Sequence, residues 1–256
     1  MPALIVNSSD LPAEDEIWEL MPFPVDSTLN LHSTGKYDEL LKLLKFLRLL
    51  SQNSIPQKTT IILQAYSMFN DPKLQELFSN FRDSDNCISG LKLVFDPLGR
   101  SPVQSIKWIL QGVKNSVIQK LDLSSNSLAG RSASELEEIF SLLRTSSVTD
   151  LDLSNNRLFF DLEKTKAVFE GLKDSKIKTL RLNNMSLHRD ETNLRLLEGM
   201  LPNVQEIHFD LNSIRHLSPY QKEGLKSIFP NLQRTYIKAD QRLMPQTLLM
   251  SMGFPW

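Results

Sequence analysis

Carboxylate side chains near the middle of the chain are the residues best suited to chemistry. Asp122 and Asp152 occupy the same place in two nearly identical phrases, KLDLSSNSL and DLDLSNNRL, and Asp150 opens the second phrase. Grouped carboxylates can hold a divalent cation, transfer protons or bind a basic partner. Which of these is open to them depends on the elements that bring them together.

The two phrases are copies of one repeated pattern, L-x-L-x-x-N-x-L. Leu121, Leu123, Asn126 and Leu128 make the first complete copy, and the second copy has its asparagine at Asn156. Six further segments keep the alternation of apolar and polar residues; one of them retains the asparagine, at Asn212, and the other five do not. The first positions of all eight copies, spaced by about 30 residues, are Leu29, Ile61, Leu91, Leu121, Leu151, Leu180, Ile207 and Thr235.

The segments between the phrases carry the spacing of an amphipathic helix, with apolar residues at i, i+3, i+4 and i+7. Serine or aspartate near the start of such a segment, as in LAGRSASELEE, can accept hydrogen bonds from free backbone N–H groups. Each unit is therefore predicted to run strand, loop, helix, loop. The apolar stripes are Leu40/Leu43/Leu44/Leu47, Leu74/Leu77/Phe78/Phe81, Ile106/Ile109/Leu110/Val113 and Leu136/Ile139/Phe140/Leu143.

A strand or helix with one apolar face must pack on its neighbours, so the units are predicted to stack into a solenoid with a continuous core. The phrases and their spacing resemble the leucine-rich repeats of the ribonuclease-inhibitor type, over roughly residues 25 to 245. The resemblance implies an α/β horseshoe of about eight units, with parallel strands on the concave face and helices on the convex side. It also implies that the asparagine side chain satisfies backbone groups where the chain leaves the strand. We expect an N-terminal cap over 1–25, the solenoid over 26–244 and a C-terminal cap over 245–256.

Because strand side chains alternate, the polar residues around the motif leucines should project from the concave face. Asp122, Asp150 and Asp152 would then form an acidic patch, with lysines on one side and Arg181 and His208 on the other. These aspartates can also be read as solvated residues that the repeat favours at this position. The residues predicted to bind a partner are Lys92, Phe95, Lys120, Asp122, Asp150, Asp152, Arg181, His208, Asp210 and Tyr236.

Composition narrows the classes of function. Lysine and arginine number 29 against 30 aspartate and glutamate, so no overall charge draws the chain to nucleic acid or to an anionic membrane. The single cysteine, Cys87, excludes an internal disulfide and suits a reducing compartment. No secretory signal is visible, and no stretch reaches the roughly 18 apolar residues of a membrane span. We expect a soluble cytoplasmic protein with no membrane span and no nucleic-acid partner.

Catalytic signatures are missing from the sequence. The four histidines lack metal-ligand spacing, and no phosphate loop, nucleophile elbow or cofactor fingerprint is present. Exposed carboxylates also lack the enclosed surroundings that catalysis needs. Since repeats and caps account for nearly all of the chain, we predict no enzyme activity, no metal and no cofactor. The predicted function is a module that binds a protein partner on its concave face.

Two further hypotheses come from resemblance. The chain is similar in repeat type to Ran GTPase-activating proteins, which implies regulation of a GTPase or another enzyme through loop residues such as Arg131, Arg157 and Arg189. The serine- and asparagine-rich sequence of the repeats resembles that of the leucine-rich-repeat proteins that Legionella translocates into host cells. That resemblance implies a virulence effector acting on a host protein, delivered to the host cytosol without a cleaved signal peptide. The sequence does not identify the partner, the surface that binds it or the oligomeric state. It also leaves open whether binding inhibits or recruits the partner.

Overall fold

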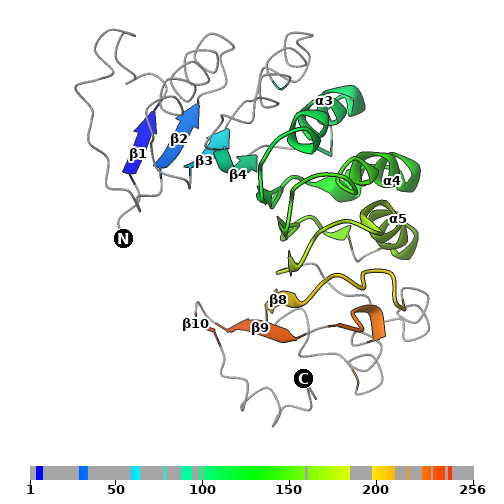
Figure 1. The fold of residues 1–256 in the computed structure, drawn as a ribbon. Coiled ribbons are helices and arrows are strands. Elements are labelled where there is room, and N and C mark those ends of the chain that lie inside the picture. Colours follow the sequence, from blue (N-terminus) through cyan, green and yellow to red (C-terminus); the bar gives the residue numbers. More distant parts are fainter. Residues whose placement is uncertain are drawn as a thin grey trace, which may run out of the picture.

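The chain curves into an arc, with its strands along the inner side and its helices along the outer side (Figure 1). The computed structural model describes residues 4–7, 29–33, 59–63, 78, 88–93, 98–99, 101–158, 161–184, 198–210, 218, 227–231, 233–239 and 242–243. The elements are β1 (Leu4–Asn7), β2 (Leu29–Ser33), β3 (Thr59–Leu63), β4 (Ile88–Leu93), α3 (Val103–Lys114), β5 (Lys120–Asp122), the short 3₁₀ helix η5 (Leu128–Gly130), α4 (Ala133–Ser141), β6 (Asp150–Asp152), α5 (Leu162–Leu172), β7 (Thr179–Arg181), β8 (Glu206–Asp210), β9 (Arg234–Ala239) and β10 (Arg242–Leu243).

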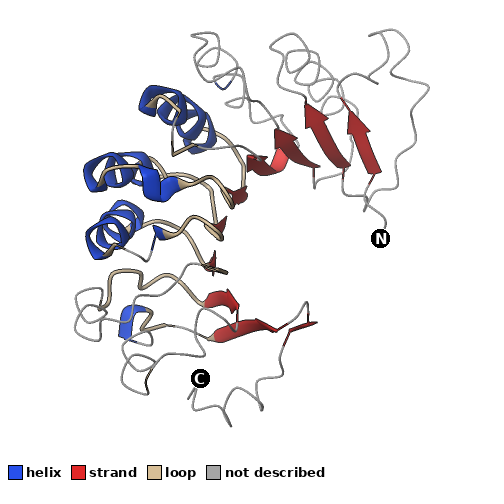
Figure 2. Cartoon of the chain, turned by 180° about the vertical axis from the view of Figure 1, so that it is seen from behind, coloured by secondary structure: helices blue, strands red, loops and turns tan. Residues whose placement is uncertain are grey.

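The strands form one sheet whose order follows the order of the chain. Each strand from β1 to β8 pairs in parallel with its successor, and β10 pairs antiparallel with β9. Parallel neighbours need a long crossover, which α3, α4 and α5 supply on the outer side (Figure 2). The predicted parallel strands and convex helices are therefore confirmed. The number of units stays a prediction, and β1 lies within the segment expected as a cap.

The core lies between the sheet and the helices. Leu121 and Leu151, the first apolar positions of the two complete phrases, are no more than 1% exposed, and the second positions Leu123 and Leu153 are equally buried. Burying one leucine contributes about 1.5–3 kcal/mol. The helix stripes predicted at 106–113 and 136–143 face this layer and are buried. The two stripes nearer the N-terminus lie outside the described residues, apart from Phe78, which is buried.

Polar side chains start two of the helices, and the one before α4 lies in a segment where such a start was predicted. Ser132 precedes α4, where its hydroxyl accepts from the backbone N–H of Glu135 and its own N–H donates to the Glu135 carboxylate at 2.9 Å. The hydrogen bond from the Ser132 backbone lowers the pKa of Glu135. Asp161 precedes α5 and accepts from Lys164 N–H at 3.2 Å. These caps satisfy N–H groups that the helices leave free.

The asparagines of the repeat phrase bind the backbone of the preceding unit. Asn156 is fully buried; its Oδ1 accepts from the N–H groups of Asn126 (2.9 Å) and Leu128 (3.2 Å). Its Nδ2 donates to the carbonyls of Leu123 and Leu153, both at 2.8 Å. The role predicted for this asparagine is confirmed.

Asn126 repeats this role only in part. Its Nδ2 donates to the carbonyls of Leu93 (3.0 Å) and Ser124 (2.9 Å). Its Oδ1 is buried and has no hydrogen-bond partner among the described residues. The loop of the preceding unit lies close to the backbone around Asn126, where the Gly99 N–H donates to the Asn126 carbonyl at 2.9 Å. A Cβ atom at Gly99 would lie 1.9 Å from the Ser127 carbonyl oxygen, so this position requires glycine.

Candidate functional site

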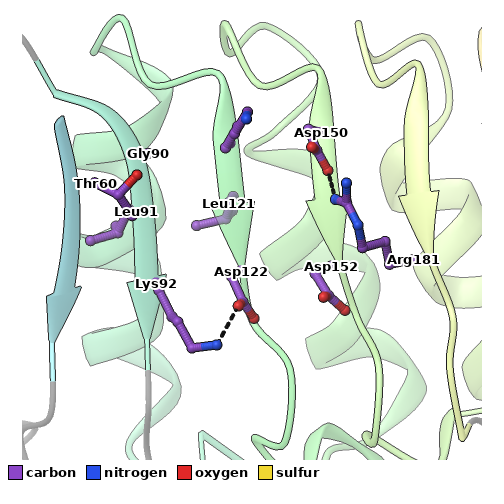
Figure 3. Close-up of a pocket in the computed structure, with 10 residues that line it drawn as sticks. Thr60, Gly90, Leu91, Lys92, Leu121, Asp122, Asp150, Asp152 and Arg181 are labelled. Carbon is purple, nitrogen blue, oxygen red and sulfur yellow. Dashed lines mark hydrogen bonds and ion pairs between the residues drawn. The ribbon is translucent and has the colours of Figure 1, made fainter. Parts of the chain in front are cut away.

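Charged residues from four neighbouring strands lie side by side on the concave face (Figure 3). Lys92, Asp122, Asp152 and Arg181 pair in register on β4, β5, β6 and β7, each between the two apolar positions of its repeat phrase. Because the flanking leucines point into the core, these side chains project toward the inside of the arc. Lys120 and Asp150 form a second, adjacent row. We call Lys92, Lys120, Asp122, Asp150, Asp152 and Arg181 the charge cluster.

Two aspartates of the cluster also stabilise the ends of their own strands. Oδ1 of Asp122 accepts from Ser124 N–H at 2.9 Å, and Oδ1 of Asp152 accepts from Ser154 N–H at 2.8 Å. This local turn is a common use of aspartate. It explains why the phrase LDLS recurs, and it leaves the second carboxylate oxygen of each aspartate for other contacts.

Two ion pairs within the charge cluster involve four of its six residues. Lys92 Nζ lies 2.7 Å from Oδ2 of Asp122, its neighbour across the strands. Arg181 forms its ion pair with Asp150 in the adjacent row and not with Asp152, which lies opposite it in register. Partly exposed pairs of this kind contribute at most about 1 kcal/mol to stability. Their main effect is to fix the positions of the charges.

Asp152 lies between Asp122 and Arg181 (Figure 3). Burial raises the pKa of Asp152 above its ordinary value, against the hydrogen bonds from Ser154 and the charge of Arg181. The negative charge of Asp122 raises it further. Burial alone would lower the pKa of Arg181, but the hydrogen bond and charge of Asp150 raise it. Both side chains are thus half-buried, whereas the alternation alone predicts that they face solvent.

The cluster surrounds a shallow depression of about 270 Å³. Gly90 stands in the row of Lys120 and Asp150, and a Cβ atom there would lie 2.7 Å from Thr60 Oγ1, so the Thr60 side chain fills the space that a side chain at Gly90 would need. Apolar and small groups complete the lining. The full set is Thr60, Gly90, Leu91, Lys92, Lys120, Leu121, Asp122, Asp150, Asp152 and Arg181.

The structure brings together six of the ten residues predicted to bind a partner. The three carboxylates do line one depression, but cations lie among them, so the surface is of mixed charge. His208 and Asp210 lie farther along the arc on β8, where His208 Nε2 is 2.9 Å from Glu206 Oε1. Tyr236 belongs to β9, in register with His208. Phe95 lies outside the described residues.

Three polar or small residues that help to form this surface stand at concave-facing positions of the repeat but were not among those predicted to bind a partner. Thr60 and Gly90 line the depression, and Glu206 pairs with His208. The signal for Gly90 was present, since glycine stands at a position where other units carry a side chain. The signal for Glu206 was its place two residues before His208, on the same face of a strand.

The loop arginines divide between structural and exposed positions. Arg131 is 7% exposed, and its Nε donates to the Leu98 carbonyl at 2.9 Å. It also pairs with Glu135. Arg157 is exposed, and Arg189 lies outside the described residues. The Arg131 side chain therefore holds two adjacent loops together and is not free to reach a partner.

The described parts of the chain contain neither a metal-ligand cluster nor a membrane span. No group of three or more histidine, cysteine, aspartate or glutamate residues there could hold a metal ion. No helix in those parts is long and apolar enough to cross a membrane.

The stacked units, the buried leucines and the asparagine bonds define a leucine-rich repeat fold. Among solved structures, the chain is similar to the leucine-rich repeat-containing protein LegL7 from Legionella pneumophila. The TM-score is 0.74 and the identity 23%, over 97% of this chain and 80% of that one. The predicted resemblance to Legionella leucine-rich-repeat proteins is confirmed for the fold. No family model matches the sequence, and a search of curated proteins finds no match.

Proposed function

We propose that the chain is a non-enzymatic module that binds a protein partner on its concave face, across β4 to β8. The charge cluster carries this proposal, because its side chains project from a paired sheet that fixes their spacing. A surface that is already ordered loses little conformational entropy on binding. The curvature of a solenoid also offers a partner more contact than a flat sheet would.

The chemistry of the cluster supports binding over catalysis. Asp122 and Asp150 already hold Lys92 and Arg181, so Asp152 has no second free carboxylate beside it with which to share an acid–base role. The depression is open and, at about 270 Å³, lies just below the roughly 300–1,000 Å³ of the concave pockets that bind small ligands. A shallow, mixed-charge surface of this kind suits contact with another protein.

Regulation of an enzyme through loop arginines has less support. Arg131 is buried against the Leu98 carbonyl, whereas a residue that stabilises a transition state in a partner must be free to reach it. Arg157 is the exposed loop arginine within the described residues on which this alternative would depend.

We propose further that the partner is a host protein and that the chain acts as a translocated effector in the host cytosol. The serine- and asparagine-rich sequence of the repeats and the structural similarity to LegL7 from Legionella pneumophila support a bacterial effector. A reporter enzyme fused to the chain should reach host cytosol from Legionella pneumophila with an intact secretion apparatus, and not from a secretion-deficient strain. Equal reporter signal from both strains would contradict translocation.

The binding proposal is tested by affinity capture from host-cell lysate with three forms of the chain. Asp152→Arg reverses a charge on the concave face, and Glu137→Arg makes the same change at an exposed position on α4. Partners are identified by mass spectrometry, after circular dichroism has shown that each variant is folded. A partner retained by the wild type and by Glu137→Arg, but lost with Asp152→Arg, is the expected result. Loss only with Glu137→Arg would place the binding surface on the convex side.

A further inference from the structure

We infer that the depression within the charge cluster accepts one basic side chain, an arginine or a lysine, that the protein partner presents, and that Asp152 is its counter-ion. This inference rests on the proposed function, since it specifies what the partner brings to the concave face. It follows from the charges, the solvation and the size of the depression.

The charges around the depression leave one carboxylate without a cation. Lys92 is held by Asp122, and Arg181 is held by Asp150. Asp152 accepts a hydrogen bond from Ser154 N–H and forms no ion pair within the described residues. A positive group placed over Asp152 would therefore complete a row in which each carboxylate has its own cation.

Solvation distinguishes Asp152 from the other unmatched charge, Lys120. Lys120 is exposed, so water solvates its ammonium group. Asp152 is half-buried, and burial favours its neutral form. A cation close to a poorly solvated carboxylate favours the ionised form, so the attraction is stronger at Asp152 than between fully hydrated charges. The unmet requirement of this surface is thus for positive charge.

The size and lining of the depression fit a side chain. A volume of about 270 Å³ is below the range typical of small-ligand pockets. Thr60, Gly90, Leu91 and Leu121 also line the depression. The two leucine side chains are 1% exposed and point into the core, so the strand backbone and the Thr60 side chain supply the uncharged part of this lining. Arginine and lysine have apolar stems that pack on such groups while the charged end reaches a carboxylate. The mixed lining therefore matches the two ends of a basic side chain.

A defined probe tests this inference without the partner. Acetyl-arginine N-methylamide is titrated into the isotope-labelled chain, and the assigned backbone amide signals are followed by NMR. Acetyl-citrulline N-methylamide, which has nearly the same shape and no charge, is the matched control. Asp152→Asn is the matched variant, because its side-chain oxygen can still accept from Ser154 N–H.

We expect the arginine probe to shift the amides of residues 90–92, 120–122 and 150–152. The dissociation constant should be at least tenfold weaker for citrulline, and also for arginine with Asp152→Asn. Equal binding of both probes, or preference for an acetyl-glutamate probe, would overturn the inference, as would no shift at these amides. Capture of the partner with Asp152→Arg is an independent readout, so the proposed function can stand when the inference fails.

Discussion

Replacing each buried asparagine of the repeat by alanine tests how the loops are held. Asn156 and Asn126 occupy the same motif position and are both fully buried. Asn156→Ala removes the partner of four backbone groups, the N–H groups of Asn126 and Leu128 and the carbonyls of Leu123 and Leu153. A fifth group, the Ser154 carbonyl, keeps the Ser125 N–H as a donor. Asn126→Ala removes partners from two carbonyls, those of Leu93 and Ser124.

The free energies follow from these contacts. A buried polar group left without a partner costs about 1–3 kcal/mol, and water entering the space left by the amide favours the low end. Asn156→Ala should therefore lower the free energy of unfolding by about 4 kcal/mol, and Asn126→Ala by about 2 kcal/mol. The second change also removes Oδ1 of Asn126, which has no partner within the described residues. Against a typical total of about 5–15 kcal/mol, both losses are large.

Urea unfolding followed by circular dichroism measures the difference. The two variants are compared at one temperature and pH, and the slope of the free energy with urea must stay the same for the comparison to hold. An equal loss in both variants, or a larger loss in Asn126→Ala, would refute the reasoning. It would mean that the asparagine contributes mainly by filling space.

Three more predictions concern the core, a loop and a titrating group. Leu151→Asp buries an unpaired charge at a 0% exposed position and should abolish cooperative thermal unfolding; a native-like melt would refute the strand register. Gly99→Ala should lower the melting temperature by several degrees, because its Cβ would overlap the Ser127 carbonyl oxygen, and an unchanged melt would contradict that contact. Asp152 has a raised pKa, so its contribution to stability is lost as pH rises from about 4 through that pKa. The free energy of unfolding of Asp152→Asn, measured with urea relative to wild type, should therefore be larger at about pH 7 than at about pH 3. The same difference between variant and wild type at both pH values would contradict this.

Much of the fold could be predicted from the sequence, because each repeat meets the same neighbours. Leu121 and Leu151 alternate with polar residues in the same phrase, and both are buried against the helices. The asparagine of the phrase could also be interpreted, since an amide within an apolar segment needs partners and the nearest backbone supplies them. Within the repeated units, the residues that the sequence pattern marks as apolar are therefore the ones that pack in the core.

The pairing of charges could not be predicted in the same way. Alternation places Arg181 opposite Asp152, yet its guanidinium reaches Asp150 in the adjacent row. Arg131 lies in a polar loop segment, where the sequence alone predicts an exposed side chain, yet this side chain is buried against the Leu98 carbonyl. Arginine is long enough to choose among several partners, and that choice depends on side-chain rotamers and on loop positions that a one-dimensional pattern does not contain.

The asparagine contacts give the stack of repeats a direction. The amide of Asn156 closes the loop of the unit before it, and the amide of Asn126 reaches back to Leu93. The Lys164 ammonium likewise reaches back to the Ala129 carbonyl. Removing a unit therefore strips partners from buried backbone groups of its predecessor, whereas its successor loses contacts at exposed or partly buried groups, such as those of the Arg144 side chain with the Gly171 and Glu170 carbonyls. A disruption should spread preferentially toward the amino terminus, so damage at one repeat threatens the part of the chain synthesised before it more than the part synthesised after.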